Sequence, residues 1–222
     1  MALPTLLLAS SSPRRRYLLS LAGWTFSIAP AEVDETPFPA EKPQPYTLRL
    51  AEAKARAVLP LAAENTLILA ADTTVADGDA LLGKPAGADE ARQMLRRLRG
   101  RTHQVYTAVA ALEPASGRLL TDLCSSQVPM REYSDDEMEA YIASGDPLDK
   151  AGAYAIQNSA FQPVASFRGC FANVMGLPLC HLTRMLKKFE VAPRQDVAQA
   201  CQTALRYECS IYPAVLRGED AG

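Results

Sequence analysis

The chain is poor in the residues that most often build metal centres and catalytic triads. It has only two histidines, His103 and His181, and its five cysteines are scattered without a CxxC pair. A structural zinc site uses Cys and His ligands at short spacings. Ser-His-Asp and Cys-His catalysis need a histidine beside the nucleophile. The sequence therefore argues against both kinds of site.

Long apolar runs and an excess of one charge are also missing. No run approaches the roughly 20 apolar residues of a membrane span, and no basic segment precedes the apolar stretch near the N-terminus, as a signal peptide requires. The net charge is -2, so we expect no nucleic-acid or membrane partner. Separated cysteines in odd number are typical of free thiols in a reducing compartment. We expect a cytoplasmic protein in which Cys201 and Cys209 stay unpaired.

What the chain does contain is an alternation of strand and helix patterns. Its 222 residues, 48% of them apolar, suffice for one large domain or two small lobes, and the alternation predicts an α/β fold. Strands are expected over residues 3–9, 25–29 and 66–71, with a hairpin over 104–112 and 119–130. Helices are expected over residues 46–58, 89–98, 134–143, after Pro178, and near Val197 to Ala204.

A basic cluster follows the first expected strand, in the stretch LASSSPRRRYLL at residues 8–19. Ser12 is a good helix N-cap, and Pro13 suits the first helical position. A helix start attracts anions, and the three arginines that follow carry guanidinium groups that match phosphate oxygens in pairs. The stretch is therefore either a phosphate or carboxylate site, or a capped helix with a solvated basic first turn.

Three more polar clusters allow both a functional and a structural interpretation. Asp72 follows a buried strand, where it could hold Mg²⁺, orient water or form an Asx turn. Lys84, in a Gly-Lys-Pro turn, could meet a phosphate or only solvent. The loop GDPLDK at residues 145–150 carries two aspartates and a lysine, which could bind metal and phosphate or pair with each other. Together with Glu35, these groups fit phosphate-ester or anhydride chemistry assisted by a divalent metal.

Seven segments, in the same order along the chain, resemble those of the Maf family of nucleoside triphosphate pyrophosphatases. They are LASSSPRRRYLL, LAEAKA, AADTTV, LLGKP, GRTHQVYTAV, GDPLDKAGAYAIQ and NVMGLPL, and they cover about residues 3–188. The resemblance implies a two-lobed α/β fold, similar to inosine triphosphate pyrophosphatases, with a long mixed curved sheet and a central cleft. It divides the chain into a Maf-like domain over residues 1–190 and an extension over 191–222. We expect the extension to pack on the domain or on a partner subunit.

The same resemblance implies a reaction and a site. A nucleoside triphosphate and water give a nucleoside monophosphate and pyrophosphate by attack at the α-phosphorus, with Mg²⁺ or Mn²⁺ as cofactor, and family members often form homodimers. Asp72 falls at the position of the family's proton acceptor, and Glu35 and Asp72 fall at positions of the family's metal site. The residues that match the family's substrate site are Ser10, Arg14, Arg15, Lys54, Thr73, Lys84 and Gln157.

The loop DKAGAYAIQ is similar to that of the branch that hydrolyses dTTP and UTP, in which the positions matching Arg14, Thr73 and Gln157 are associated with specificity. We therefore expect dTTP, UTP and modified pyrimidine nucleotides as substrates. Two alternatives stay open: a pyrophosphatase acting on 7-methyl-GTP or other modified nucleotides, and a non-catalytic regulator of septum formation. The sequence departs from the family at Asn158, where glycine usually follows the glutamine.

Overall fold

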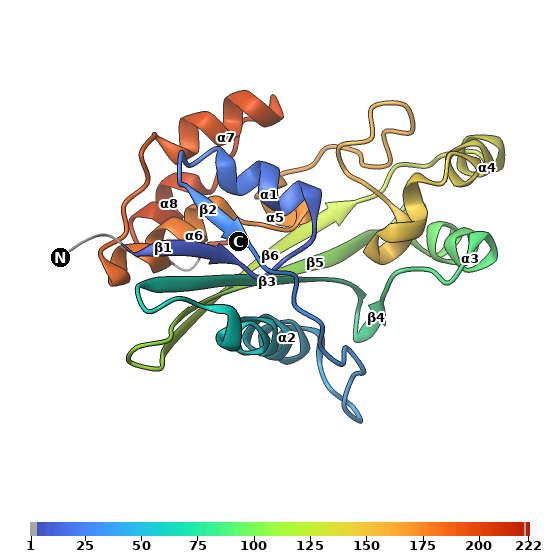
Figure 1. Cartoon of the computed structure of the whole chain (residues 1–222). Coiled ribbons are helices and arrows are strands. Elements are labelled where there is room, and N and C mark those ends of the chain that lie inside the picture. Colours follow the sequence, from blue (N-terminus) through green and yellow to red (C-terminus); the bar gives the residue numbers. More distant parts are fainter. Residues whose placement is uncertain (1–3, 220) are drawn as a thin grey trace.

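A mixed sheet of six strands runs through the molecule (Figure 1). The computed structural model describes residues 4–219 and 221–222. The strands are β1 (Thr5–Leu8), β2 (Phe26–Ile28), β3 (Thr66–Asp77), β4 (Ala80–Leu82), β5 (Thr102–Glu113) and β6 (Arg118–Pro129). Their order is β2-β1-β3-β5-β6, with β4 paired to β3. β1 pairs in parallel with β2 and β3, and the remaining pairs are antiparallel.

Helices cover both faces of this sheet. They are α1 (Pro13–Ser20), α2 (Pro43–Ala57), α3 (Ala88–Leu98), α4 (Asp135–Ala143), α5 (Phe171–Met175), α6 (Leu179–Leu186), α7 (Val197–Leu205) and α8 (Tyr212–Leu216). In Figure 1, α2 lies on one face, α1 and α5 to α8 lie on the other, and α3 and α4 lie beyond the end of the long strands. The α/β class and the long mixed sheet are thus confirmed.

Separate hydrophobic cores define the two lobes of the molecule. The core of the larger lobe includes Leu69 and Ala71, beneath α1 and α6. The core of the smaller lobe, between α3, α4 and the sheet, includes Val75, Leu95 and Val105. β3 therefore contributes buried side chains to both cores. The cleft described below lies where the strand passes from one core to the other.

The strand that carries Asp72 is longer than its sequence pattern predicts. A strand ending at residue 71 was expected, but β3 continues to Asp77. Asp72 pairs with Ala108 and Thr73 with Thr107 on β5, and threonine and valine favour the pleated backbone. The expectation that Asp72 follows the strand is therefore wrong, because pairing with β5 carries the strand through the polar residues.

Other element ends differ less. α2 begins at Pro43 rather than at residue 46, since prolines fit the first turn of a helix. The hairpin of β5 and β6 is confirmed, with Glu113 opposite Arg118 at its turn. The helix expected over residues 134–143 is α4, which Ser134 caps and in which Ser134 and Glu137 form a capping box. The expected first strand began at residue 3, which lies outside the described residues, and β1 begins at Thr5.

The extension packs against the body of the protein. The indole Nε1 of Trp24 donates to the carbonyl of Ala192 at 2.9 Å, and the amide of Arg194 donates to the carbonyl of Ala22 at 3.0 Å. Val197, at the start of α7, is buried in the core of the larger lobe. The predicted helix in the tail is confirmed by α7.

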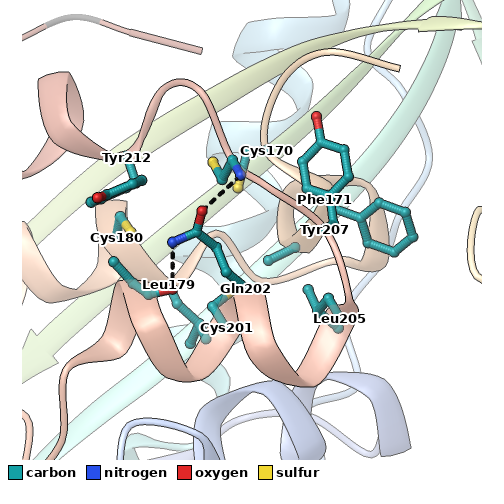
Figure 2. A pocket seen from close by; sticks show the side chains of 12 residues that line it. Cys170, Phe171, Leu179, Cys180, Cys201, Gln202, Leu205, Tyr207 and Tyr212 are labelled. Atoms are coloured by element: carbon teal, nitrogen blue, oxygen red, sulfur yellow. Dashed lines mark hydrogen bonds between the residues drawn. The ribbon is translucent and has the colours of Figure 1, made fainter. Parts of the chain in front are cut away.

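The five cysteines gather where the extension meets the body. All are free thiols, and Cys201 and Cys209 are half-buried, as expected. Cys170, Cys180 and Cys201 line a small pocket together with Tyr212 (Figure 2). Burial raises the pKa of Cys180 to about 12 and that of Cys201 to about 11. These thiols are therefore protonated near neutral pH and serve as packing groups.

His103 is a buried residue of the smaller lobe, fully shielded from solvent. Its Nε2 lies 2.8 Å from the hydroxyl of Tyr154, which lines the cleft. Burial lowers the pKa of His103 from 6.5 to about 4. Its burial and its contact with Tyr154 make His103 a structural residue of the smaller lobe.

We predict that His103 makes the folding stability depend on pH. Between pH 6.5 and about 4 the unfolded chain binds a proton at this histidine and the folded chain does not, so the free energy of unfolding falls as the pH falls. Over the whole window the loss amounts to about 3 kcal/mol. In His103→Gln this contribution should vanish, whereas Tyr154→Phe, which keeps the histidine, should retain it. Urea denaturation from pH 7 to 4 measures the effect, and identical pH profiles for the wild type and His103→Gln would contradict it.

Candidate active site

A cleft of about 580 Å³ lies at the middle of β3, between the lobes. Its walls come from the start of α1, the segment before α2, α2 itself, the turn after β4 and the loop around residue 150. All the site residues predicted from the sequence line this cleft: Ser10, Arg14, Arg15, Glu35, Lys54, Asp72, Thr73, Lys84 and Gln157. Segments separated by up to 147 positions along the chain are thus brought to one place.

Lys54 joins two carboxylates at the floor of the cleft. Its Nζ lies 2.6 Å from Asp72 Oδ1 and 2.6 Å from Glu35 Oε1. The side chains of Lys54 and Asp72 are buried, whereas that of Glu35 is 54% exposed. Asp72 Oδ2 also accepts a longer hydrogen bond, 3.4 Å, from Thr74. Because α2 and β3 hold the lysine and the aspartate rigidly, the carboxylate of Asp72 has a fixed direction.

The charge on Glu35 is favoured by its neighbours. Burial alone would raise the pKa of Glu35, but the hydrogen bond and charge of Lys54, together with the charges of Lys84 and Arg15, lower it below its ordinary value. Tyr46 donates a 2.8 Å hydrogen bond to the carbonyl of Glu35 and so fixes the backbone there. Glu35 is therefore an ionised carboxylate that lines the cleft.

Arg15 is a structural member of the site, held by three contacts. Its Nε donates to the carbonyl of Gly176 at 2.9 Å, one terminal nitrogen lies 3.1 Å from Thr73 Oγ1, and the other lies 3.4 Å from Ser10 Oγ. Burial lowers its pKa, although the charge of Asp72 opposes this effect. Arg15 thus ties Ser10, before α1, to the middle of β3.

Gly176 is required by this close approach. It ends α5 with a φ of +109°, a conformation that side chains disfavour. A Cβ there would lie 3.2 Å from Thr73 Oγ1 and 3.5 Å from Arg15 Nε. The NVMGLPL segment therefore contributes to the site through its backbone.

Arg14 differs from Arg15 in having little to hold it. Its side chain is 30% exposed, and its ion pair with Asp149 is long at 3.9 Å. Ser12 caps α1 by accepting from the amide of Arg15, and Pro13 occupies the first turn, as predicted. Arg16 is exposed and lies outside the cleft lining. Of the three arginines, Arg14 is therefore the one that lines the cleft and, among the described residues, keeps most of its guanidinium group free for an anion.

The charged side chains of the loop around residue 150 form ion pairs within the loop. The buried ammonium of Lys150 lies 2.6 Å from Asp149 Oδ1 and 3.0 Å from Asp146 Oδ1. These charges therefore pair with each other, which is the structural one of the two interpretations that the sequence allows. Asn158 reinforces the loop by donating to Asp146 at 3.1 Å. Within the described part of the chain, the exposed side chain of Gln157 makes no hydrogen bond, so its amide is available to a ligand.

Several residues of the cleft were not predicted as site residues, although Tyr154 and Gly176 lie in segments that resemble the family. Tyr46 lies in a helix pattern, Tyr154 lies in a loop, and the role of Gly176 depends on contacts with distant segments. A helical tyrosine and a loop tyrosine are common in any globular protein. Only the packing of α2 and the loop against β3 reveals that these residues line the site.

The cleft suits a polyphosphate. Arg14, Lys54 and Lys84 bring positive charge to its walls, and Ser10 adds a hydroxyl at the start of α1. In the described residues, no group of three or more His, Cys, Asp or Glu side chains could hold a metal ion by itself. The carboxylates of Glu35 and Asp72, which share the ammonium of Lys54, still fit a Mg²⁺ site. Mg²⁺ is commonly bound by one or two carboxylates plus substrate phosphates and water.

A family model described as "Maf-like protein" matches residues 5–189. The chain belongs to this family. A dTTP/UTP pyrophosphatase of Anaeromyxobacter dehalogenans (strain 2CP-1 / ATCC BAA-258) is 46% identical over 187 residues, which are 83% of this chain and 94% of the relative. A dTTP/UTP pyrophosphatase of Thermomicrobium roseum is 42% identical over 222 residues, 98% of each chain, an alignment that includes the extension.

Among solved structures, the Staphylococcus aureus Ham1 protein matches 57% of this chain and 71% of its own, with a TM-score of 0.39 and 14% identity. The family assignment rests on the family model and the sequence relatives. Within the described residues, no helix is long and apolar enough to cross a membrane.

We predict that Lys54→Met destabilises the fold through the buried carboxylate it leaves behind. Removing one partner of a buried ion pair typically costs about 3 kcal/mol or more, because the remaining charge is unpaired. The double variant Lys54→Met, Asp72→Asn should recover much of this loss, since it removes both charges. Chemical denaturation at pH 7 of the four proteins in this cycle provides the test. An additive cycle would show that the two groups do not interact.

Proposed function

We propose that this protein hydrolyses nucleoside triphosphates to nucleoside monophosphates and pyrophosphate, with dTTP, UTP and modified pyrimidine nucleotides as substrates. The observation that carries the proposal is the placement of Asp72 on Lys54 at the floor of a cationic cleft. Such a cleft binds a polyphosphate and offers a fixed proton acceptor. The relatives named dTTP/UTP pyrophosphatase, 41% to 46% identical, support the same reaction.

The cations divide the work of binding. Arg14, held only by a long ion pair to Asp149, offers its guanidinium group to the triphosphate. Lys84 also lines the cleft, where it is exposed and close enough to influence Glu35. Ser10 lies at the start of α1, where the helix dipole favours negative charge. Arg15 positions Ser10 and Thr73 from behind.

Asp72 accepts the proton of the attacking water. As the water oxygen bonds to the α-phosphorus, the bond from that phosphorus to the bridging oxygen breaks and pyrophosphate leaves. Lys54 keeps the aspartate oriented and compensates its charge. Glu35 and Asp72 would hold a divalent cation, Mg²⁺ or Mn²⁺. When bound, the cation neutralises phosphate charge and makes the phosphorus easier to attack.

Arg14, Thr73 and Gln157 are proposed to set the choice of nucleotide. Thr73 is fixed by Arg15 and by Thr107, 3.0 Å away, while Gln157 projects a free amide. We further propose a homodimer in the cytoplasm, in keeping with the five free thiols. A pyrophosphatase for 7-methyl-GTP and a septum-formation regulator are the outcomes that a substrate panel with pyrophosphate detection would expose.

We predict that Asp72→Asn lowers the turnover of dTTP and UTP by about 10²- to 10⁴-fold, the usual loss on removing a general base. Asp136→Asn removes an exposed carboxylate on α4 and should leave the rate unchanged. Pyrophosphate release and nucleoside monophosphate should be measured together, with folding checked by circular dichroism. Near-wild-type turnover in folded Asp72→Asn would reject the assignment. Orthophosphate as the product would reject the proposed reaction.

We predict that Arg14→Ala weakens binding of a non-hydrolysable triphosphate about 10- to 100-fold, because a charge-assisted hydrogen bond is lost. Arg14→Lys should restore only part of the affinity, since an ammonium cannot form the paired geometry. Arg16→Ala, two positions along the same helix, is the matched control and should bind normally. Calorimetric titration distinguishes them, and equal losses at both positions would indicate a general charge effect.

A further inference from the structure

A second hollow of about 580 Å³ lies beside the cleft and is built partly by the extension. Gln157 and Met175 line both spaces, so the hollow continues the cleft beyond them. On its far side, α7 and the residues after it contribute Ala204, Leu205 and Tyr207. These three residues lie outside the part of the chain that matches the family model.

The two spaces differ in chemistry. The cleft carries arginines, lysines and carboxylates, whereas no charged side chain of the described residues lines the hollow. Its walls are aromatic, aliphatic and amide groups, with Tyr17 and Phe167 among them. A nucleotide has the same division, with charged phosphates at one end and a flat, uncharged base at the other.

Tyr17 lines the hollow from α1, the helix that also brings Arg14 to the cleft. It follows Arg14 by three residues on α1, so the two side chains are neighbours on the helix surface. Its side chain is among the large apolar groups most exposed on the protein, at 47%. In the described part of the chain its hydroxyl has no hydrogen-bond partner. An exposed ring beside a phosphate-binding arginine is well placed to stack on a base.

The wall from the extension is held in position. The hydroxyl of Tyr207 accepts from the amide of Gly169 at 3.1 Å and donates to the carbonyl of Phe167 at 3.3 Å. Its ring packs against those of Phe167 and Phe171, with centroids 5.5 Å and 5.3 Å away. Figure 2 shows Phe171, Leu205 and Tyr207 gathered at one end of the thiol-lined pocket. Hydrogen bonds and ring packing therefore fix the position of this wall.

We propose that the hollow is the nucleobase subsite, with Tyr17 against the face of the base, Gln157 at its polar edge, and the extension as its outer wall. The inference rests on the proposed function, because it assumes that the triphosphate lies in the cleft. The extension then contributes to the choice of substrate as well as to stability. A pyrimidine monophosphate carries the base, and pyrophosphate carries only phosphate. Binding of each compound therefore reports on the hollow and on the cleft separately.

The test fills the hollow from the extension. Ala204→Phe places a ring in the hollow, and Thr203→Phe places the same ring at the neighbouring exposed position outside its lining. Binding of UMP and of pyrophosphate is measured by calorimetry, and UTP turnover is measured in parallel. Ala204→Phe should weaken UMP binding at least 10-fold and raise the KM for UTP, with pyrophosphate affinity unchanged. Thr203→Phe should behave as the wild type.

Tyr17→Ala tests the inner wall without altering the extension. Loss of stacking should weaken UMP binding about 5- to 100-fold and leave pyrophosphate binding unchanged. Unaltered UMP affinity in Tyr17→Ala, or in folded Ala204→Phe, would overturn the proposal, as would a wild type that does not bind UMP. If UMP binding responds as expected but the wild type releases no pyrophosphate from UTP, the proposed reaction fails and the subsite stands.

Discussion

The buried ammonium of Lys54 is the interaction on which the site depends. It lies between one carboxylate from β3 and one from the segment before α2. Without it, Asp72 would be an uncompensated charge in the sheet, a costly arrangement. With it, two acidic groups occupy the floor of a cleft that must also attract anions. The same contact fastens α2 to β3, so the geometry of the site and the packing of a helix on the sheet have one cause.

The two neighbouring arginines illustrate how position divides roles between identical residues. Arg15 points inward and is occupied by Gly176, Thr73 and Ser10, whereas Arg14 keeps most of its hydrogen-bonding capacity. The positive end of the helix dipole disfavours cations there, so the acceptors around Arg15 are needed to offset it. Arg15 donates to acceptors of the fold, and Arg14 is left to bind an anion.

Much of this arrangement could be predicted from local sequence patterns. The cap at Ser12, the hairpin and the helix near Val197 follow from spacing and turn residues, and the order of seven segments indicates the family. The length of β3 could not be predicted in this way, because it depends on pairing with a strand 34 residues further along at Thr107. The same reason hides Tyr46, Tyr154 and the outer wall of the second hollow, whose roles come only from segments meeting in space.

The long strands also determine how the molecule can move. β3, β5 and β6 are 12 residues each and are paired along most of their length, and β3 and β5 place side chains in the cores of both lobes. A hinge between the lobes would have to break this ladder of hydrogen bonds, so closing by rotation of whole lobes is disfavoured. The cleft is therefore a preorganised receptor, which spends little of its binding energy on reshaping itself. Adjustment to a ligand is left to the loops and side chains at the rim.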